Sequence, residues 1–164
     1  MAVHDAPLPT DHSARVLAAD GADYRARLKA DPAFQAFWLL RIAFTVAPIL
    51  FGADKFAHVL VNWDLYFAPR LDRIVPGTVH QAMYAVGAIE IVAGLVVFLA
   101  PRWGGYLVAL WLVGIIVNLM LIPGFYDVAL RDFGLLLAAL TLTRLSAAYP
   151  ADAAPLALLR HAQA

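Results

Sequence analysis

Four long runs of apolar residues follow one another between residues 37 and 145, separated by more polar or Pro/Gly-containing connections. The runs cover residues 37–61, 82–100, 103–122 and 126–145. Each is close to the roughly 20 residues that an α-helix needs to cross about 30 Å of hydrocarbon. Two connections, Pro101-Arg102 and Pro123 to Phe125, are short enough to join antiparallel neighbours. The pattern predicts an all-α integral membrane protein, a bundle of four transmembrane helices.

The segments that flank these runs are more polar. Residues 1–36 predict a tail, disordered over residues 1–12, whose part from Ser13 to Ala33 forms a short amphipathic helix on the membrane surface. Residues 146–164 are rich in Ala and predict a second, loosely ordered tail. The connection over residues 62–81 carries aromatic rings among charged residues, which predicts a cap at the membrane interface.

Basic residues outside the runs are unevenly distributed between the two predicted sides of the membrane. One side holds Arg15, Arg25, Arg27, Lys29, Arg102, Arg144 and Arg160, and the other holds Arg70 and Arg73. Because cytoplasmic segments of membrane proteins carry an excess of Lys and Arg, this bias predicts that both termini lie in the cytoplasm.

The composition narrows the range of partners. The chain is 63% hydrophobic and 15% charged, against about 25% charged residues in soluble domains. Its formal net charge is zero and it has no basic run, which argues against nucleic acid as a partner. It has no cysteine, which excludes disulfides, thiolate metal sites and cysteine nucleophiles. The predicted partners are the lipid bilayer, a membrane redox protein or a second copy of the chain.

Polar side chains occur in all four runs toward the same predicted side. With both termini inside, the outer half holds Asp54, Lys55, His58, Glu90, Asn118, Asp127, Arg131 and Asp132. An ionisable group at the centre of a membrane helix costs about 2.5–3.5 kcal/mol on insertion scales, so such groups normally face the bundle interior and indicate function. These eight residues are therefore predicted to form one polar cluster and to be candidates for a ligand-binding site.

Glu90 is the strongest candidate, because apolar sequence flanks it on both sides. The cluster contains four carboxyl groups against one Lys and one Arg, so we expect a carboxyl to be protonated or to be compensated by His58 or a bound cation. Glu90 is our candidate for the protonated group. It shares a helix face with Gly87 and Gly94, where small residues let a neighbouring helix or a ligand come close.

The polar residues of the first run also have structural interpretations. Arg41 is near the cytoplasmic end and can extend its side chain to the interface. Asp54, Lys55 and His58 would lie in water if the first helix ended near Gly52. If the helix continues, Asp54 and His58 have the i,i+4 spacing that allows them to pair.

The later runs leave similar alternatives. Asp127 and Arg131 are spaced i,i+4 and fit an exposed ion pair at a helix start, where a carboxylate is favourable. Glu90 could make an interhelical hydrogen bond that only fixes packing. His58 is the only histidine within the four runs, so neither a metal site nor a haem held by two histidines is predicted.

At these residues the chain resembles the DoxX-like family of small bacterial membrane proteins. The match covers about residues 37–145 and rests on Arg41, on Gly52-Ala53-Asp54-Lys55, on Gly87-Ala88-Ile89-Glu90 with Gly94, and on Arg131-Asp132. The resemblance implies a four-helix protein of the bacterial cytoplasmic membrane. Some relatives are associated with quinone-linked oxidation of sulfur compounds or with redox enzyme complexes. Thiol-dependent quinone reductases resemble this fold broadly but use cysteines, which this chain lacks.

Three functions remain open. The first is a membrane subunit that binds a small apolar or quinone-like molecule, with a polar site end formed by Glu90, Lys55, Arg131 and Asp132, because a quinone carbonyl requires a protonatable carboxyl beside a cation. The second is an accessory or assembly subunit whose buried charges specify helix packing. The third is a small proton-coupled carrier. The sequence shows no nucleophile with a base and no nucleotide loop, so a catalytic role is expected only within a quinone-linked oxidoreductase complex.

Overall fold

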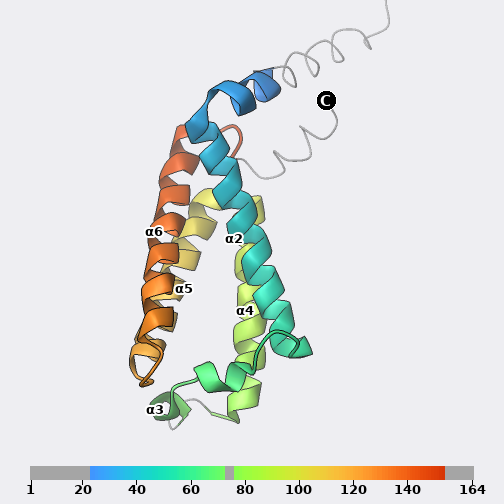
Figure 1. The fold of residues 1–164 in the computed structure, drawn as a ribbon. Helices are drawn as coiled ribbons and strands as arrows, with labels where there is room; N and C mark the ends of the chain where they lie inside the picture. Colours follow the sequence, from blue (N-terminus) through green and yellow to red (C-terminus); the bar gives the residue numbers. More distant parts are fainter. Residues whose placement is uncertain (1–22, 73–75, 154–164) are drawn as a thin grey trace, which may run out of the picture.

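The computed structural model describes residues 23–72 and 76–153, and all regular structure within these ranges is helical (Figure 1). Its four long helices are α2 (Pro32–Ala57), α4 (Val79–Leu99), α5 (Pro101–Met120) and α6 (Tyr126–Ala148). The 3-10 helix η1 (Trp63–Tyr66) and the short helix α3 (Pro69–Asp72) lie between α2 and α4. The predicted all-α class is therefore confirmed. The predicted disorder of residues 1–12 and most of the second tail lie outside the described residues.

Local caps set the ends of α2, and the prediction of residues 37–61 was wrong at both ends. The helix begins at Pro32 because the side chain of Asp31 accepts hydrogen bonds from two backbone N–H groups of the first turn. Proline is favourable there, since its missing N–H needs no partner in the helix. The helix ends at Ala57 because His58 adopts the left-handed conformation, with φ of 54°.

The other boundaries also differ from the predicted ones by a few residues. The helix α4 begins at Val79, not at residue 82, because Thr78 and Gln81 form a capping box that satisfies the first turn. The predicted surface helix ends before Ala33: residues 23–30 are helical, the chain breaks at Asp31, and residues 13–22 lie outside the described residues.

The long helices form two antiparallel pairs. The helix α2 packs along α4, and α5 packs along α6, whereas contact between the two pairs is far less extensive (Figure 1). Glycines allow α2 and α4 to approach closely, as predicted for Gly87 and Gly94. A Cβ atom added to Gly52 would lie 2.5 Å from the carbonyl oxygen of Gly87, and one added to Gly94 would lie 2.7 Å from the carbonyl oxygen of Thr45.

The two ends of the molecule differ. We call the end formed by residues 23–31, the start of α2 and the end of α6 the termini end, and the end formed by η1 and α3 the loop end (Figure 1). The termini end has an aromatic core in which Tyr24, Phe34, Phe37, Trp38 and Tyr149 make edge, tilted and stacked ring contacts. Such a core holds the start of α2 against the end of α6.

Three helices are long and apolar enough to cross a membrane: α2, α4 and α5. Their outward faces are apolar, with large side chains such as Leu39, Leu110 and Val117 exposed. Helix α6 is of similar length but carries Asp127, Arg131, Asp132 and Arg144. The membrane character predicted from the sequence is thus supported for three of the four predicted spans.

Candidate functional site

The most deeply buried ion pair among residues 23–72 and 76–153 joins α2 to α4 in the loop half of the molecule. The Lys55 Nζ atom lies 2.6 Å from Glu90 Oε2, and the two side chains are only 4% and 11% exposed. The pair lies one helical turn beyond the contact between Gly52 and Gly87, so the glycines bring the two helices close enough for it to form. Both charged residues were predicted members of the polar cluster.

A tryptophan from η1 covers the lysine. The Lys55 Nζ atom lies 3.7 Å from the ring centroid of Trp63, a cation–π contact. The ring is held by Asp54, whose Oδ2 atom accepts a hydrogen bond of 2.7 Å from Trp63 Nε1. The Oδ1 atom of Asp54 accepts from the backbone N–H groups of Val59 and Leu60, at 3.0 Å each. Asp54 therefore positions the loop and the tryptophan.

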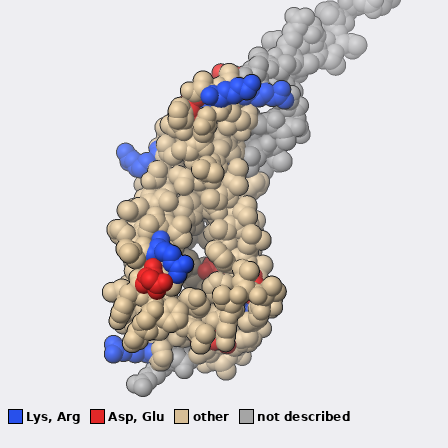
Figure 2. Space-filling view, in the orientation of Figure 1, with Lys and Arg blue, Asp and Glu red and all other residues tan. Residues whose placement is uncertain are grey.

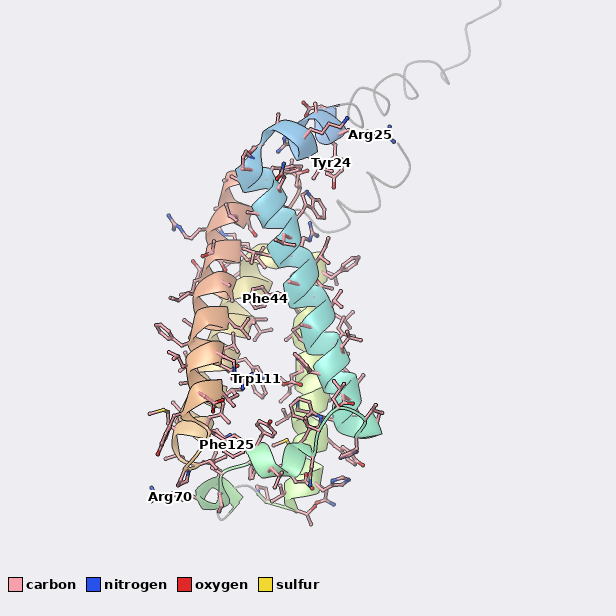
Figure 3. All side chains as sticks on the ribbon, viewed as in Figure 1. Tyr24, Arg25, Phe44, Arg70, Trp111 and Phe125 are labelled. Carbon is pink, nitrogen blue, oxygen red and sulfur yellow. The ribbon has the colours of Figure 1, made fainter. Side chains whose placement is uncertain are left out.

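Two side chains from the other helix pair face Glu90. The indole of Trp111 on α5 and the half-buried carboxyl of Asp132 on α6 both act on the Glu90 carboxylate. The indole nitrogen of Trp111 is buried and makes no hydrogen bond of standard geometry within the described residues. Figure 3 shows Trp111 in the space between α6 and α4. Groups from all four long helices therefore meet near Glu90.

The surface is hollowed beside this cluster. Figure 2 shows a hollow between α6 and the α2–α4 pair in the loop half, with an acidic side chain visible inside it. The hollow is consistent with the limited contact between the two helix pairs. A polar cluster that adjoins a hollow can be reached by a molecule that enters between the helices.

Asn118, another predicted member, fastens the loop to α5. Its Nδ2 atom donates to the carbonyl oxygen of Tyr66 at 2.6 Å, and its Oδ1 atom accepts from the backbone N–H of Ala68 at 2.9 Å. The ring of Tyr66 also packs edge-on against Phe125 in the α5–α6 connection. The loop thus covers the end of the helices, in the place predicted for the cap.

Three predicted members lie outside the buried cluster. Asp127 and Arg131 form an ion pair of 3.5 Å on α6, with side chains 74% and 71% exposed. His58 is exposed and its ring stacks on that of His80, so it does not pair with Asp54. The alternative of an exposed helix-start pair therefore describes Asp127 and Arg131, whereas Asp54 and Lys55 are buried and do not lie in water.

Arg41 lies in the opposite half, near the termini end, and is only 1% exposed. Two of its nitrogens donate hydrogen bonds of 2.6 Å, Nη1 to the carbonyl oxygen of Asp152 and Nη2 to that of Phe98. The carbonyl of Phe98 belongs to the last turn of α4, where no helical donor remains. Arg41 thus caps α4 from inside, and the interpretation of a side chain extended to the interface was wrong.

A small cavity of about 150 Å³ adjoins Arg41 and not the Lys55–Glu90 pair. It is lined by Trp38, Arg41, Ile42, Thr45, Val46 and Phe98. Its accessible lining is apolar, and the unpartnered Arg41 Nε and Thr45 Oγ1 atoms are themselves buried. The cavity therefore offers no polar group that could orient a ligand.

A second, partly buried network closes the termini end. Arg27 pairs with Asp152 at 3.2 Å, and the Tyr149 hydroxyl donates to Asp31 at 2.8 Å. The hydrogen bond from Tyr149, with those from backbone N–H groups of the first turn of α2, lowers the pKa of Asp31. The same hydrogen bond raises the pKa of Tyr149. This network holds chain segments together and contains no open site.

Two residues of the site, Trp63 and Trp111, were not predicted. Trp63 lies in the connection predicted to be an interfacial cap, and that prediction does not indicate its contact with Lys55. A signal for Trp111 was present, because it precedes Asn118 by seven residues and therefore shares its face of α5. Within an apolar run, a tryptophan alone gives no indication of whether it faces lipid or a polar group.

The cluster can bind a hydrogen-bonding head group but has no catalytic constellation of its own. A lysine, a carboxylate and an indole N–H can orient a carbonyl or hydroxyl oxygen. No group of three or more side chains able to hold a metal ion occurs within the described ranges. Comparison of the chain with protein-family models, with curated proteins and with solved structures gave no match.

Proposed function

We propose that this chain is a bacterial cytoplasmic-membrane protein whose four long helices all span the bilayer, with the termini end on the cytoplasmic side. In the outer half, between the two helix pairs, it binds a small apolar, quinone-like molecule at Glu90 and Lys55. It acts there as a membrane subunit beside a redox partner protein.

The observation that carries this proposal is the buried Lys55–Glu90 pair beside a hollow. A lysine and a carboxylate whose only role was to join two helices would need no further polar neighbour. Here, the carboxylate also faces the indole N–H of Trp111, which approaches it without a hydrogen bond of standard geometry, and lies near a second carboxyl, Asp132. Buried polar groups normally make well-formed hydrogen bonds, so an indole N–H that meets its carboxylate only loosely, next to a hollow, supports an acceptor that binds there.

The quinone class is supported by chemistry and by resemblance. A quinone has an apolar body and carbonyl oxygens that accept hydrogen bonds, which suits a lysine and an indole N–H in apolar surroundings. A carboxyl beside a lysine can also hold or release a proton next to such an oxygen. The resemblance to the DoxX-like family, some of whose members are associated with quinone-linked redox complexes, favours the same choice.

The test is titration of the purified protein with a short-chain ubiquinone, followed by quenching of tryptophan fluorescence. Glu90→Gln should weaken binding about tenfold, the effect of losing roughly 1.4 kcal/mol of interaction with a charged group. Asp127→Asn, at an exposed carboxyl, is the matched control and should bind as the wild type does. Equal affinity in Glu90→Gln and wild type, with both proteins monodisperse, would refute the site.

An accessory or assembly role is the second candidate. The position of the Lys55–Glu90 pair directly beside the Gly52–Gly87 contact favours it, because the pair then fixes how α2 packs on α4. This role predicts that Glu90→Gln loses monodispersity and that wild type does not respond to the quinone. Native mass spectrometry of wild type extracted from its own membrane would then show a stoichiometric partner protein and no retained quinone.

A further inference from the structure

One face of α6 is exposed along most of its length. Viewed along the helix, it lies opposite the side that packs on α5, where Ala139, Thr143 and Ser146 are buried. The exposed face is formed by Asp127, Leu130, Arg131, Gly134, Leu137 and Thr141. A Cβ atom added to Gly134 would meet nothing within 4 Å, so this face is open over the described part of the chain.

This face does not suit lipid as well as the outward faces of α2, α4 and α5 do. Those three helices have the composition of membrane spans, and α6 does not. Arg131 is five residues into α6, or about 8 Å along its axis. The start of α6 does not lie at the outermost part of the loop end, since Figure 3 shows Phe125 above Arg70. Arg131 and Asp127 pair along the helix at 3.5 Å, but an exposed ion pair at this depth is still costly unless protein covers it.

The charges on this face are self-complementary. Two copies inserted in the same orientation and related by a two-fold axis along the membrane normal place Asp127 of each copy near Arg131 of the other. The two positions differ by one helical turn, about 6 Å, which an arginine side chain can span. Gly134, one turn further on, allows the helices to approach closely.

We propose that a second copy of this chain covers the exposed face of α6, in a parallel dimer held by two reciprocal Asp127–Arg131 pairs. Two of the four charges of α6, those of Asp127 and Arg131, then lie between two proteins. This contact is distinct from the Lys55–Glu90 cluster, which lies on the inward side of the helix pairs.

Single-cysteine cross-linking in native membranes tests the contact without background, because the chain has no cysteine of its own. Leu130→Cys should form a disulfide-linked dimer under mild oxidation. Leu110→Cys on α5 is the matched control, since the two leucines are 72% and 71% exposed, and it should remain monomeric. Equal cross-linking of the two variants, or none at Leu130→Cys, would overturn the proposal.

Charge exchange tests the pairing itself. Added to the Leu130→Cys chain, either Arg131→Asp or Asp127→Arg should reduce the dimer about tenfold or more, because like charges then face each other across the contact. Co-expression of these two variants, with tags of different size, should restore the dimer as a mixed species. An unchanged yield in the single variants, or no mixed dimer on co-expression, would show that these charges do not form the contact.

Discussion

Arg41 and Lys55 are both buried cations on α2, but they are satisfied in different ways. Arg41 donates to two main-chain carbonyl groups, those of Phe98 and Asp152, within the packed termini end. Lys55 donates to the side chain of Glu90, in the loop half, where the helix pairs separate and the Trp111 indole approaches the same carboxylate without a hydrogen bond of standard geometry. The first arrangement fixes helix ends in place. The second joins side chains that can rotate, exchange protons or accept another partner.

The difference teaches how to distinguish buried charges that build a fold from those that form a site. A main-chain carbonyl at a helix end needs a donor in any protein, so Arg41 has a complete structural explanation. A carboxylate that faces a lysine, an indole and a second carboxyl has more polar neighbours than packing requires. Both residues look alike in the sequence, as single charges within one apolar run.

The largest effect is expected at Arg41. Arg41→Leu leaves two buried carbonyl groups without their donor and should reduce the free energy of unfolding by about 3–5 kcal/mol, because each unsatisfied buried acceptor costs roughly 1–3 kcal/mol. Urea unfolding in detergent, followed by circular dichroism, measures this loss. Arg144→Leu, at an exposed arginine of α6, should leave stability nearly unchanged. If both variants unfold alike, Arg41 does not cap α4.

A smaller loss of stability, which a second substitution can restore, is expected at the Lys55–Glu90 pair. Lys55→Met leaves the buried Glu90 carboxylate without its partner and should cost about 3 kcal/mol, the lower end of the roughly 3–5 kcal/mol that breaking a buried ion pair costs. The double variant Lys55→Met with Glu90→Leu should recover most of this loss, since apolar replacement of a buried pair is often neutral. It should nevertheless fail to bind the quinone. Recovery of binding with stability would contradict the site, and no such rescue exists for Arg41, whose partners are main-chain atoms.

The smallest effect is expected from pH at the termini end. Because the pKa of Asp31 is lowered in the folded protein, its contribution is complete above its ordinary pKa of 3.8 and is lost as pH falls through the lowered value. The pKa of Tyr149 is raised, so its contribution is complete below its ordinary pKa of 10.0 and is lost as pH rises through the raised value. Tyr149→Phe should remove the alkaline dependence and reduce the acid dependence in thermal unfolding curves, because backbone N–H groups still lower the pKa of Asp31 in the variant. Identical pH profiles for the variant and the wild type would show that this hydrogen bond does not contribute.

The helices could be predicted from hydropathy, whereas their ends could not. Long apolar runs identify α2, α4 and α5 because only length and composition matter for a span. The end of α2 depends on Asp54, which caps three residues of the following loop with its own side chain and main chain, and on the left-handed His58. Such caps depend on individual side-chain hydrogen bonds, about which the mean hydropathy over a window of residues carries no information.

The site was predictable in part for a similar reason. Glu90 and Lys55 lie on helix faces that their glycine neighbours mark as close contacts, so the sequence indicates that they face a neighbouring helix. It does not indicate which partner each one meets, because this depends on how the two helix pairs pack. His58 and Arg131 have a predicted membrane depth similar to that of Lys55 and Glu90, and yet they face outward. A depth derived from sequence carries no information about rotation around the helix axis.

The hydrogen bond from Arg41 to the main chain of Asp152 also constrains how the protein is made. Its two ends are 111 residues apart in the chain, so a ribosome that adds about 5–20 residues per second leaves the arginine without this partner for roughly 6–22 s. During that interval α2, α4, α5 and α6 all emerge. The termini end therefore closes only after the last long helix has been synthesised, and a nascent chain that stops before Asp152 lacks this hydrogen bond at Arg41.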